Sequence, residues 1–203
     1  MRSGLTAGVQ YTLAKAMDDA AAFTGASMSG SAIAQDWLNL DAEWAPSNFD
    51  QRHQVTAQFQ YTTGVGLGAG GLLSGWKGTL ARNWTVTSQM TAGSGLPLTP
   101  IFITSVAGTG VTGTVRGSLT GVPDSSTDGA YANAAAYTAP ASGQWGDAGR
   151  NSIRGPAQFS LNMGVGRTFP LGERLNLDWR IDLVNAFNRV TYASANTVVG
   201  SPQ

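Results

Sequence analysis

Five segments of the chain alternate between apolar and polar residues with a period of two: residues 5–13, 54–62, 84–92, 159–166 and 175–183. Successive side chains of a β-strand point to opposite faces, so this pattern predicts strands with one apolar and one polar face. In the second segment Val55 and Phe59 share one face, while Gln54, Gln58 and Gln60 share the other. We therefore predict an all-β fold, an antiparallel meander of about five or six long strands.

The length and the polar faces of these segments favour a membrane barrel over a soluble sheet. Each segment has about nine residues, which is enough for a tilted strand to cross a bilayer. The polar faces consist mostly of Gln, Thr, Ser, Asn and Gly, and charged residues are only 12% of the chain. This composition fits a water-filled lumen. In the fifth segment Asp178, Arg180 and Asp182 have the polar parity, so we expect them in the lumen, forming cross-strand ion pairs.

The connections between the segments alternate in length. The connections over residues 14–53 and 93–158 are long, with about 40 and 60 residues, whereas roughly 20 residues separate the second and third segments. A tight turn around Phe169–Glu173 joins the last two. Long loops outside and brief turns on the periplasmic side are typical of outer-membrane barrels. We predict a partial transmembrane β-barrel with two long extracellular loops and a first strand that runs outward.

Composition excludes several other classes of protein. The formal net charge is +0, whereas a nucleic-acid-binding protein needs a basic surface. The chain has no cysteine, which excludes disulfides and cysteine-based zinc sites. No apolar run approaches the roughly 18 residues of a transmembrane helix. We expect no nucleic-acid partner, no cofactor and no metal.

Several short stretches, which together extend over most of the chain, carry a family resemblance: Gly4–Asp18, Asn48–His53, Ser94–Leu98, Gly146–Pro156 and Asp182–Asn188. In these stretches and in their order, the chain resembles the C-terminal β-barrel part of TonB-dependent-receptor-like outer-membrane proteins. The resemblance is to the large Oar-like group, whose members have a carboxypeptidase-regulatory-like N-terminal domain.

The resemblance implies a location in the outer membrane and a role in the uptake of a scarce, unknown ligand. In such receptors the ligand binds at the external loops, and the TonB energy complex moves a plug domain. Outer-membrane lipid, the plug and that complex are therefore the expected partners. The plug, the TonB box and the final strand with its terminal aromatic residue do not occur in residues 1–203. We thus expect a partial barrel, an internal or truncated piece of a cylinder of about 22 strands.

Candidate ligand contacts at the extracellular rim are Arg52, His53, Trp145, Arg150 and Arg154. His53 is the only histidine of the chain. Since no second histidine and no suitable nucleophile accompany it, we expect a protein that is not an enzyme. At this point of the chain we expect hydrogen bonds from Asp50 and Arg52 to start the second strand.

Two loop segments have a functional and a structural interpretation. The stretch Gly146–Asn151 is rich in glycine, but a phosphate-binding loop needs a preceding buried strand and a following helix. We expect a tight turn that leads into the fourth strand, with a ligand contact as the alternative. The segment over residues 17–50 is acidic and includes Asp18, Glu43 and Asp50. It lacks the spacing of an EF-hand calcium loop, so a solvated loop is the better interpretation.

A second hypothesis is a soluble or surface-attached β-sheet binding module, such as an adhesin. There the apolar parity would form one buried core, and aromatic residues such as Tyr11, Trp84 and Phe159 would pack inside it rather than form a membrane belt. Arg82 has the same parity as Trp84 and is awkward on a lipid-facing strand, unless it lies at the membrane interface.

Overall fold

The computed structural model describes residues 4–19, 34–64, 75–110, 113–125, 131–172, 174–192 and 196–200. The chain divides into two compact units. The first unit comprises Met1–Thr12, His53–Gly93 and Gln158–Thr191. The second unit comprises Leu13–Arg52, Ser94–Ala157 and Tyr192–Gln203. The long strands lie in the first unit, apart from the last residue of the first strand.

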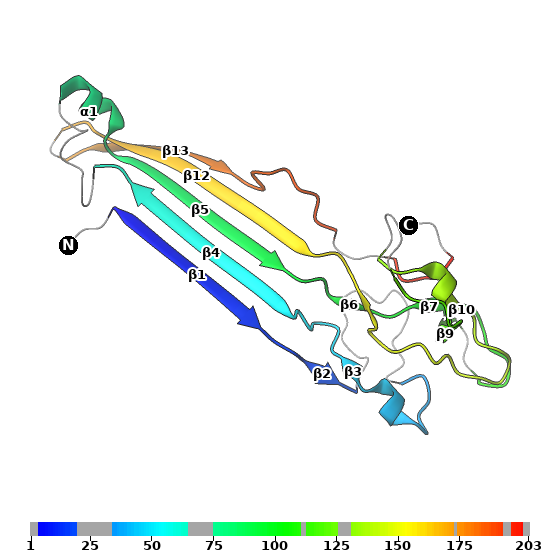
Figure 1. Cartoon of the computed structure of the whole chain (residues 1–203). Helices are drawn as coiled ribbons and strands as arrows, with labels where there is room; N and C mark the ends of the chain where they lie inside the picture. Colours follow the sequence, from blue (N-terminus) through cyan, green and yellow to red (C-terminus); the bar gives the residue numbers. More distant parts are fainter. Residues whose placement is uncertain are drawn as a thin grey trace. The chain divides into compact units, whose positions relative to one another are not determined.

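The first unit is one sheet of five long strands: β1 (Leu5–Leu13), β4 (His53–Thr62), β5 (Trp84–Gly93), β12 (Gln158–Pro170) and β13 (Asn176–Leu183). The strands lie side by side in chain order (Figure 1). Strands β4, β5, β12 and β13 pair with their neighbours in antiparallel register. The predicted meander is therefore confirmed. The main difference is β12, which continues past the predicted end at residue 166 to Pro170.

The registers bring the predicted apolar residues of neighbouring strands together. Val86 of β5 lies opposite Tyr61 on one side and Val165 on the other, and Val165 lies opposite Ile181. The polar residues align in the same way, as in the row of Gln58, Gln89 and Asn162. A slip of one residue would exchange the two faces of a strand, so this alignment fixes one continuous apolar face and one continuous polar face.

The apolar face is open along its edge strands. Val9 of β1 is 77% exposed, and Leu177 and Ile181 of β13 are 54% and 47% exposed. A soluble β-sandwich buries such a face against a second sheet. A soluble β-sheet module would bury these large side chains, whereas here they are exposed. Their exposure matches strands whose apolar face meets lipid.

One end of the sheet carries a short helix that the sequence did not indicate. Helix α1 (Gly75–Ala81) precedes β5, and Arg82 follows it in a turn in which its N–H bonds to the carbonyl of Gly78. Arg82 is thus outside the strand, so the difficulty of an arginine on a lipid-facing strand position does not arise. Asn83 then adopts a left-handed conformation with φ 63°. Among the described residues no helix is long and apolar enough to cross a bilayer.

The predicted turn between the last two strands lies at this end too. Pro170 pairs with Asn176, and the N–H of Leu171 bonds to the carbonyl of Leu175 at 2.8 Å. The connection is therefore shifted by about two residues from the predicted Phe169–Glu173. Glu173 itself lies outside the described residues.

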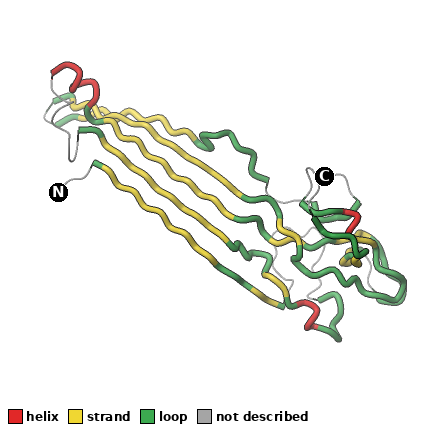
Figure 2. Tube along the Cα trace, viewed as in Figure 1, coloured by secondary structure: helices red, strands yellow, loops and turns green. Residues whose placement is uncertain are grey.

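The second unit consists mainly of loops joined by short elements (Figure 2). Its strands are β2 (Met17–Asp18), β3 (Ala45–Pro46), β6 (Pro97–Leu98), β7 (Ile101–Ile103), β8 (Thr114–Arg116), β9 (Ser118–Leu119), β10 (Tyr137–Thr138) and β11 (Ile153–Arg154). Two 3-10 turns span Leu40–Glu43 and Ala134–Ala136. The side chain of Asn133 caps the second turn. The strands form antiparallel pairs, β2 with β3, β6 with β11, β7 with β8 and β9 with β10.

A small apolar core lies within this unit. It is formed by Ala136, Tyr137, Ala148 and Ile153, with Leu98 and Phe102 packed against it. The sequence predicts the two long connections to be extracellular loops. Their described residues fold together into one compact unit.

Candidate functional site

Six charged side chains of the second unit form ion pairs, and together we call them the ionic cluster: Asp18, Glu43, Arg116 and Arg150, which are linked to one another, and the separate pair of Asp50 and Arg154. Glu43 and Asp50 are each 2% exposed. For these two residues this corrects the interpretation of the acidic segment as a solvated loop, because an isolated buried carboxylate is costly unless it is paired. Asp41 is exposed, as that interpretation expects, and residues 20–33 of the segment lie outside the described residues. Within the described residues no three acidic or histidine side chains stand close enough to hold a metal ion.

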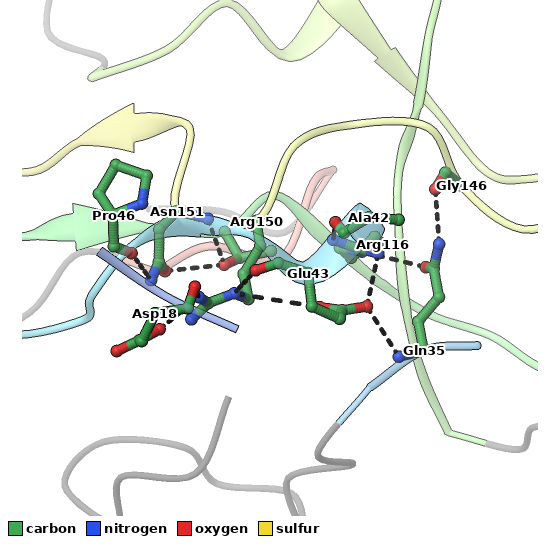
Figure 3. Close-up of polar contacts among 10 residues, drawn as sticks. Asp18, Gln35, Ala42, Glu43, Pro46, Arg116, Gly146, Arg150 and Asn151 are labelled. Carbon is green, nitrogen blue, oxygen red and sulfur yellow. Dashed lines mark hydrogen bonds and ion pairs between the residues drawn. The ribbon is translucent and has the colours of Figure 1, made fainter. Parts of the chain in front are cut away.

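Glu43 and Arg116 form the centre of the cluster (Figure 3). The Arg116 Nη2 donates to Glu43 Oε1 at 2.8 Å, and both side chains are under 10% exposed. Gln35 completes the arrangement, since its Oε1 accepts from Arg116 Nε and its N–H donates to Glu43 Oε1. Burial lowers the pKa of Arg116; the charge of Glu43 opposes this, and that of Arg150 adds to it.

Arg150, from the second long connection, also bonds to residues of the first long connection. Its Nε donates to the carbonyl of Glu43 at 2.9 Å, and its Nη2 donates to the carbonyl and the carboxylate of Asp18. The neighbouring Asn151 adopts a left-handed conformation with φ 55° and donates to the carbonyl of Pro46 at 2.7 Å. Asparagine tolerates this backbone region better than most residues, which accounts for its place here.

Asp50 and Arg154 form a third pair, at 2.6 Å. Asp50 also accepts the N–H of Ala16 at 2.8 Å. Burial alone would raise the pKa of Asp50, but the hydrogen bonds from Ala16 and Arg154 and the nearby positive charges outweigh it and hold the pKa below its ordinary value. The expected hydrogen bonds of Asp50 near the start of β4 are present, whereas Arg52 contributes its backbone carbonyl to the N–H of Ala14.

Two of the stretches that carried the family resemblance, Ser94–Leu98 and Gly146–Pro156, meet in this unit. Gly95 and Gly155 approach so closely that a Cβ on Gly95 would lie 1.8 Å from the carbonyl oxygen of Gly155. A Cβ on Gly146 would lie 2.1 Å from the carbonyl oxygen of Arg116. Both glycines are therefore required for close backbone packing. The glycine-rich stretch serves as a structural junction that leads through β11 towards β12.

Tyr137 adds a titratable group to the apolar core of the unit. Its hydroxyl donates to Asp124 Oδ2 at 2.5 Å. Burial, together with the hydrogen bond to Asp124 and the charge of that carboxylate, raises the pKa of Tyr137 to about 12. The neutral phenol is thus the form that the fold favours.

The five predicted rim residues occupy different environments. Arg150 is buried and Arg154 is partly exposed, and both belong to the ionic cluster. Trp145 is half-buried and Arg52 is exposed, both in the second unit. His53 starts β4 in the first unit, where its ring stacks on Tyr11 and its Nδ1 lies 2.8 Å from the Tyr11 hydroxyl. A ligand-binding role for these residues stays a prediction.

The six residues predicted to face the lumen share the polar face of the sheet: Gln54, Gln58, Gln60, Asp178, Arg180 and Asp182. Arg180 and Asp182 form an ion pair at 2.8 Å within β13, not across strands as predicted. Asp178 instead accepts from the Thr168 hydroxyl of β12 at 2.6 Å. On β12, Gly164 lies opposite Asp182 and Gly166 lies opposite Arg180, and these glycines leave room for the two charged side chains.

Three important residues were not singled out for their roles by sequence reasoning. Glu43 ends a 3-10 turn and Arg116 ends β8, and their pairing joins positions 73 residues apart, which no local pattern reveals. Arg167 lies on the apolar face opposite Trp84 and Trp179. The sequence does contain a signal for Arg167, because this residue continues the apolar parity of Phe159 beyond the predicted end of the fourth strand.

Comparison with known proteins gives one match. The model of a family described as "Outer membrane beta barrel domain" matches residues 1–203. No curated protein and no solved structure shows significant similarity to the chain.

Proposed function

Because the chain belongs to the outer membrane β-barrel domain family, we propose that it supplies wall strands and external, ligand-facing loops to a TonB-dependent receptor. The chain is a β-barrel protein of the outer membrane. The family match does not extend to the transport role, which we infer from the resemblance of its sequence motifs and from the chemistry of its two sheet faces.

The observation that carries the proposal is the polar face of the five-stranded sheet. A barrel whose interior is filled by packed side chains would have an apolar inner face. This face is polar instead, with Gln54, Gln58 and Gln60 beside Gln89 and Asn162. Two charged side chains, Arg180 and Asp182, are 63% and 54% exposed there. Such a face suits the wide, hydrated interior of a large barrel, in which a plug or a solute finds hydrogen-bonding partners.

The second unit supports the ligand-binding part of the proposal. A receptor needs loops held in one arrangement, because ordering them on binding would reduce affinity. The ionic cluster connects the two long connections through Glu43, Arg116 and Arg150. Arg52, Trp145 and Arg154 are the members of the predicted rim set in this unit that are not buried. We propose that they contact the ligand.

We further propose that the protein is not an enzyme. Its single histidine is engaged with Tyr11, and the buried carboxylates of Glu43 and Asp50 are paired with arginines. Groups held in this way stabilise a fold, and they are poorly placed to exchange protons with a substrate.

The test is conductance across planar bilayers combined with binding of the isolated periplasmic domain of TonB. If the proposal is right, the receptor purified from outer membranes conducts little current until a denaturant displaces its plug. It also binds the TonB domain. A constant open conductance without TonB binding would identify a passive channel and contradict the proposal. Arg52→Gln and Trp145→Ala are expected to leave both readouts unchanged and to weaken uptake of the ligand.

A further inference from the structure

An aromatic and basic patch lies at the α1 end of the sheet, on its apolar face. We call it the interface patch. It consists of four strand residues, Trp84, Arg167, Phe169 and Trp179, together with Trp76 and Leu80 of helix α1, which is hydrogen-bonded to two of them. Trp84, Arg167 and Trp179 lie in one register row across β5, β12 and β13. Trp84 and Trp179 meet edge to face, with ring centroids 6.0 Å apart.

Arg167 is an unusual residue for a face that meets lipid. Its guanidinium carbon lies 5.3 Å from the ring centre of Trp84 and 4.6 Å from that of Phe169. Its Nη2 donates to the carbonyl of Thr79 in α1, while its buried Nε has no hydrogen-bond partner among the described residues. A guanidinium has five N–H donors, so the described residues use only a small part of its hydrogen-bonding capacity.

Helix α1 extends the apolar part of the patch. The indole N–H of Trp84 donates to the carbonyl of Leu80 at 2.8 Å, which ties the helix to the apolar face. Trp76 and Leu80 lie one helical turn apart and are 70% and 57% exposed. A helix this short does not expose a tryptophan and a leucine to bulk water without cost, but both side chains suit the boundary between headgroups and acyl chains.

The charge at this end complements an anionic surface. Arg82 at the end of α1 and Arg174 in the turn before β13 are both exposed. Asp178 is the neighbour of Trp179 on β13, one register position away from Arg167. Its side chain belongs to the polar face of the sheet, where it accepts a hydrogen bond from Thr168. Tryptophan and arginine together are the residues that settle at the headgroup level of a membrane.

We propose that the interface patch binds the phosphate of a membrane phospholipid, with Arg167 as the phosphate contact and with Trp76 and Leu80 against the upper part of the acyl chains. The patch is continuous with the lipid-facing strands, so its occupant is a lipid of the surrounding bilayer. The proposal rests on the outer-membrane location of the sheet and is independent of the transport role.

The direct test is lipid retention measured by native mass spectrometry on protein purified in a phosphate-free, neutral maltoside detergent. Phosphatidylglycerol added to the wild type is expected to give a persistent adduct. Arg167→Gln is expected to weaken that adduct roughly tenfold, the effect of one charge-assisted hydrogen bond. Arg180→Gln, which removes an arginine from the opposite face of the neighbouring strand, is the matched control and should retain the lipid.

Two further arms separate the headgroup from other sources of binding. Monoolein, which has an acyl chain but no phosphate, should bind wild type and Arg167→Gln equally and weakly. Inorganic phosphate at the same concentration should not displace phosphatidylglycerol, because it gains nothing from Trp76 and Leu80. Displacement by free phosphate, or equal retention of phosphatidylglycerol by Arg167→Gln, would overturn the proposal.

A second measurement leaves Arg167 in place, in case its substitution prevents folding. A nitroxide at Leu80→Cys is expected to report the depth of the headgroup boundary in phospholipid vesicles, while the same label at Gln89→Cys on the polar face reports no lipid contact. A fully aqueous label at position 80 would contradict the proposal, even if the protein transports its ligand as proposed.

Discussion

At the scale of single residues, the second unit depends on buried charges. Arg116 and Glu43 are both nearly excluded from solvent, and they satisfy each other at 2.8 Å. Such a pair adds little net stability compared with an apolar pair, but removal of one partner leaves a buried, uncompensated charge. These residues therefore act as positional constraints, because the loops adopt the arrangement in which every buried charge has its partner.

Substitution of Glu43 tests this directly. Glu43→Leu leaves the Arg116 guanidinium buried without its carboxylate, and we expect the second unit to lose about 3–5 kcal/mol of stability. The measurement is hydrogen exchange in the protein held in membranes, read from peptides of residues 34–50 and 113–119. Asp41→Asn, an exposed change in the same 3-10 turn, is the control and should alter exchange little. Unchanged protection in Glu43→Leu would contradict the structural role of the pair.

Asp50 predicts a dependence on acid. Its pKa in the fold is below the ordinary value of 3.8, so the folded unit favours the ionised form. The resulting stability is complete above the unfolded pKa, near pH 4, and is lost as the pH falls through the lower folded pKa. We expect the amide of Ala16, which donates to Asp50, to lose its exchange protection in that window, after correction for intrinsic rates. Asp50→Asn should be less stable at neutral pH and show no such acid transition.

At the scale of elements, the strands are two-faced because their neighbours are in register. On the polar face Gly164 faces Thr87 and Asp182 of the adjoining strands, and a Cβ there would lie 2.6 Å and 2.7 Å from their oxygens. On β1, Gly8 is also a strand glycine with polar parity, but a Cβ there meets nothing within 4 Å. The two positions have the same residue type and different surroundings.

The pair of glycines gives a matched test. Gly164→Ala is expected to destabilise the sheet by about 1–3 kcal/mol through overpacking. Gly8→Ala is expected to be neutral or to stabilise by up to about 1 kcal/mol, since glycine is unfavourable inside a strand. Urea unfolding in lipid vesicles, followed by tryptophan fluorescence, measures both. Equal effects of the two substitutions would show that the register of β12 with its neighbours is wrong.

The sequence predicted the strands better than the connections, for a physical reason. Alternation is local and binary, so the residues of β1 and β4 identify their own strands to within one position. Helix α1 has only seven residues and is held by Trp84 and Arg167, so its own sequence contains too little signal. The ionic cluster depends on pairings between residues such as Asp50 and Arg154, 104 positions apart, which one sequence does not reveal.

At the scale of the whole molecule, the order of the strands fixes which connections share a side of the membrane. In an antiparallel meander the connections after β1 and β5 leave from one end of the sheet, and those after β4 and β12 leave from the other. The long connections are predicted to be extracellular. That orientation is testable because the chain contains no cysteine.

Labelling of intact cells should distinguish the two ends. Ser142→Cys, in an exposed part of the second unit, is expected to react with a membrane-impermeant maleimide added outside. Leu171→Cys, in the turn after β12, is expected to react only after the outer membrane is permeabilised. The reverse result would invert the orientation of the first strand while leaving the fold itself intact.

The central claim is that the sheet spans the outer membrane with its apolar parity in lipid and its polar parity in water. A single-cysteine scan along β12 in native outer membranes tests it most directly. Residues Ser160 and Asn162 are predicted to react with a small water-soluble thiol reagent, and Leu161 and Met163 to stay protected and to contact a lipid-soluble probe. Uniform reactivity along both parities, or protection of the polar one, would contradict the claim.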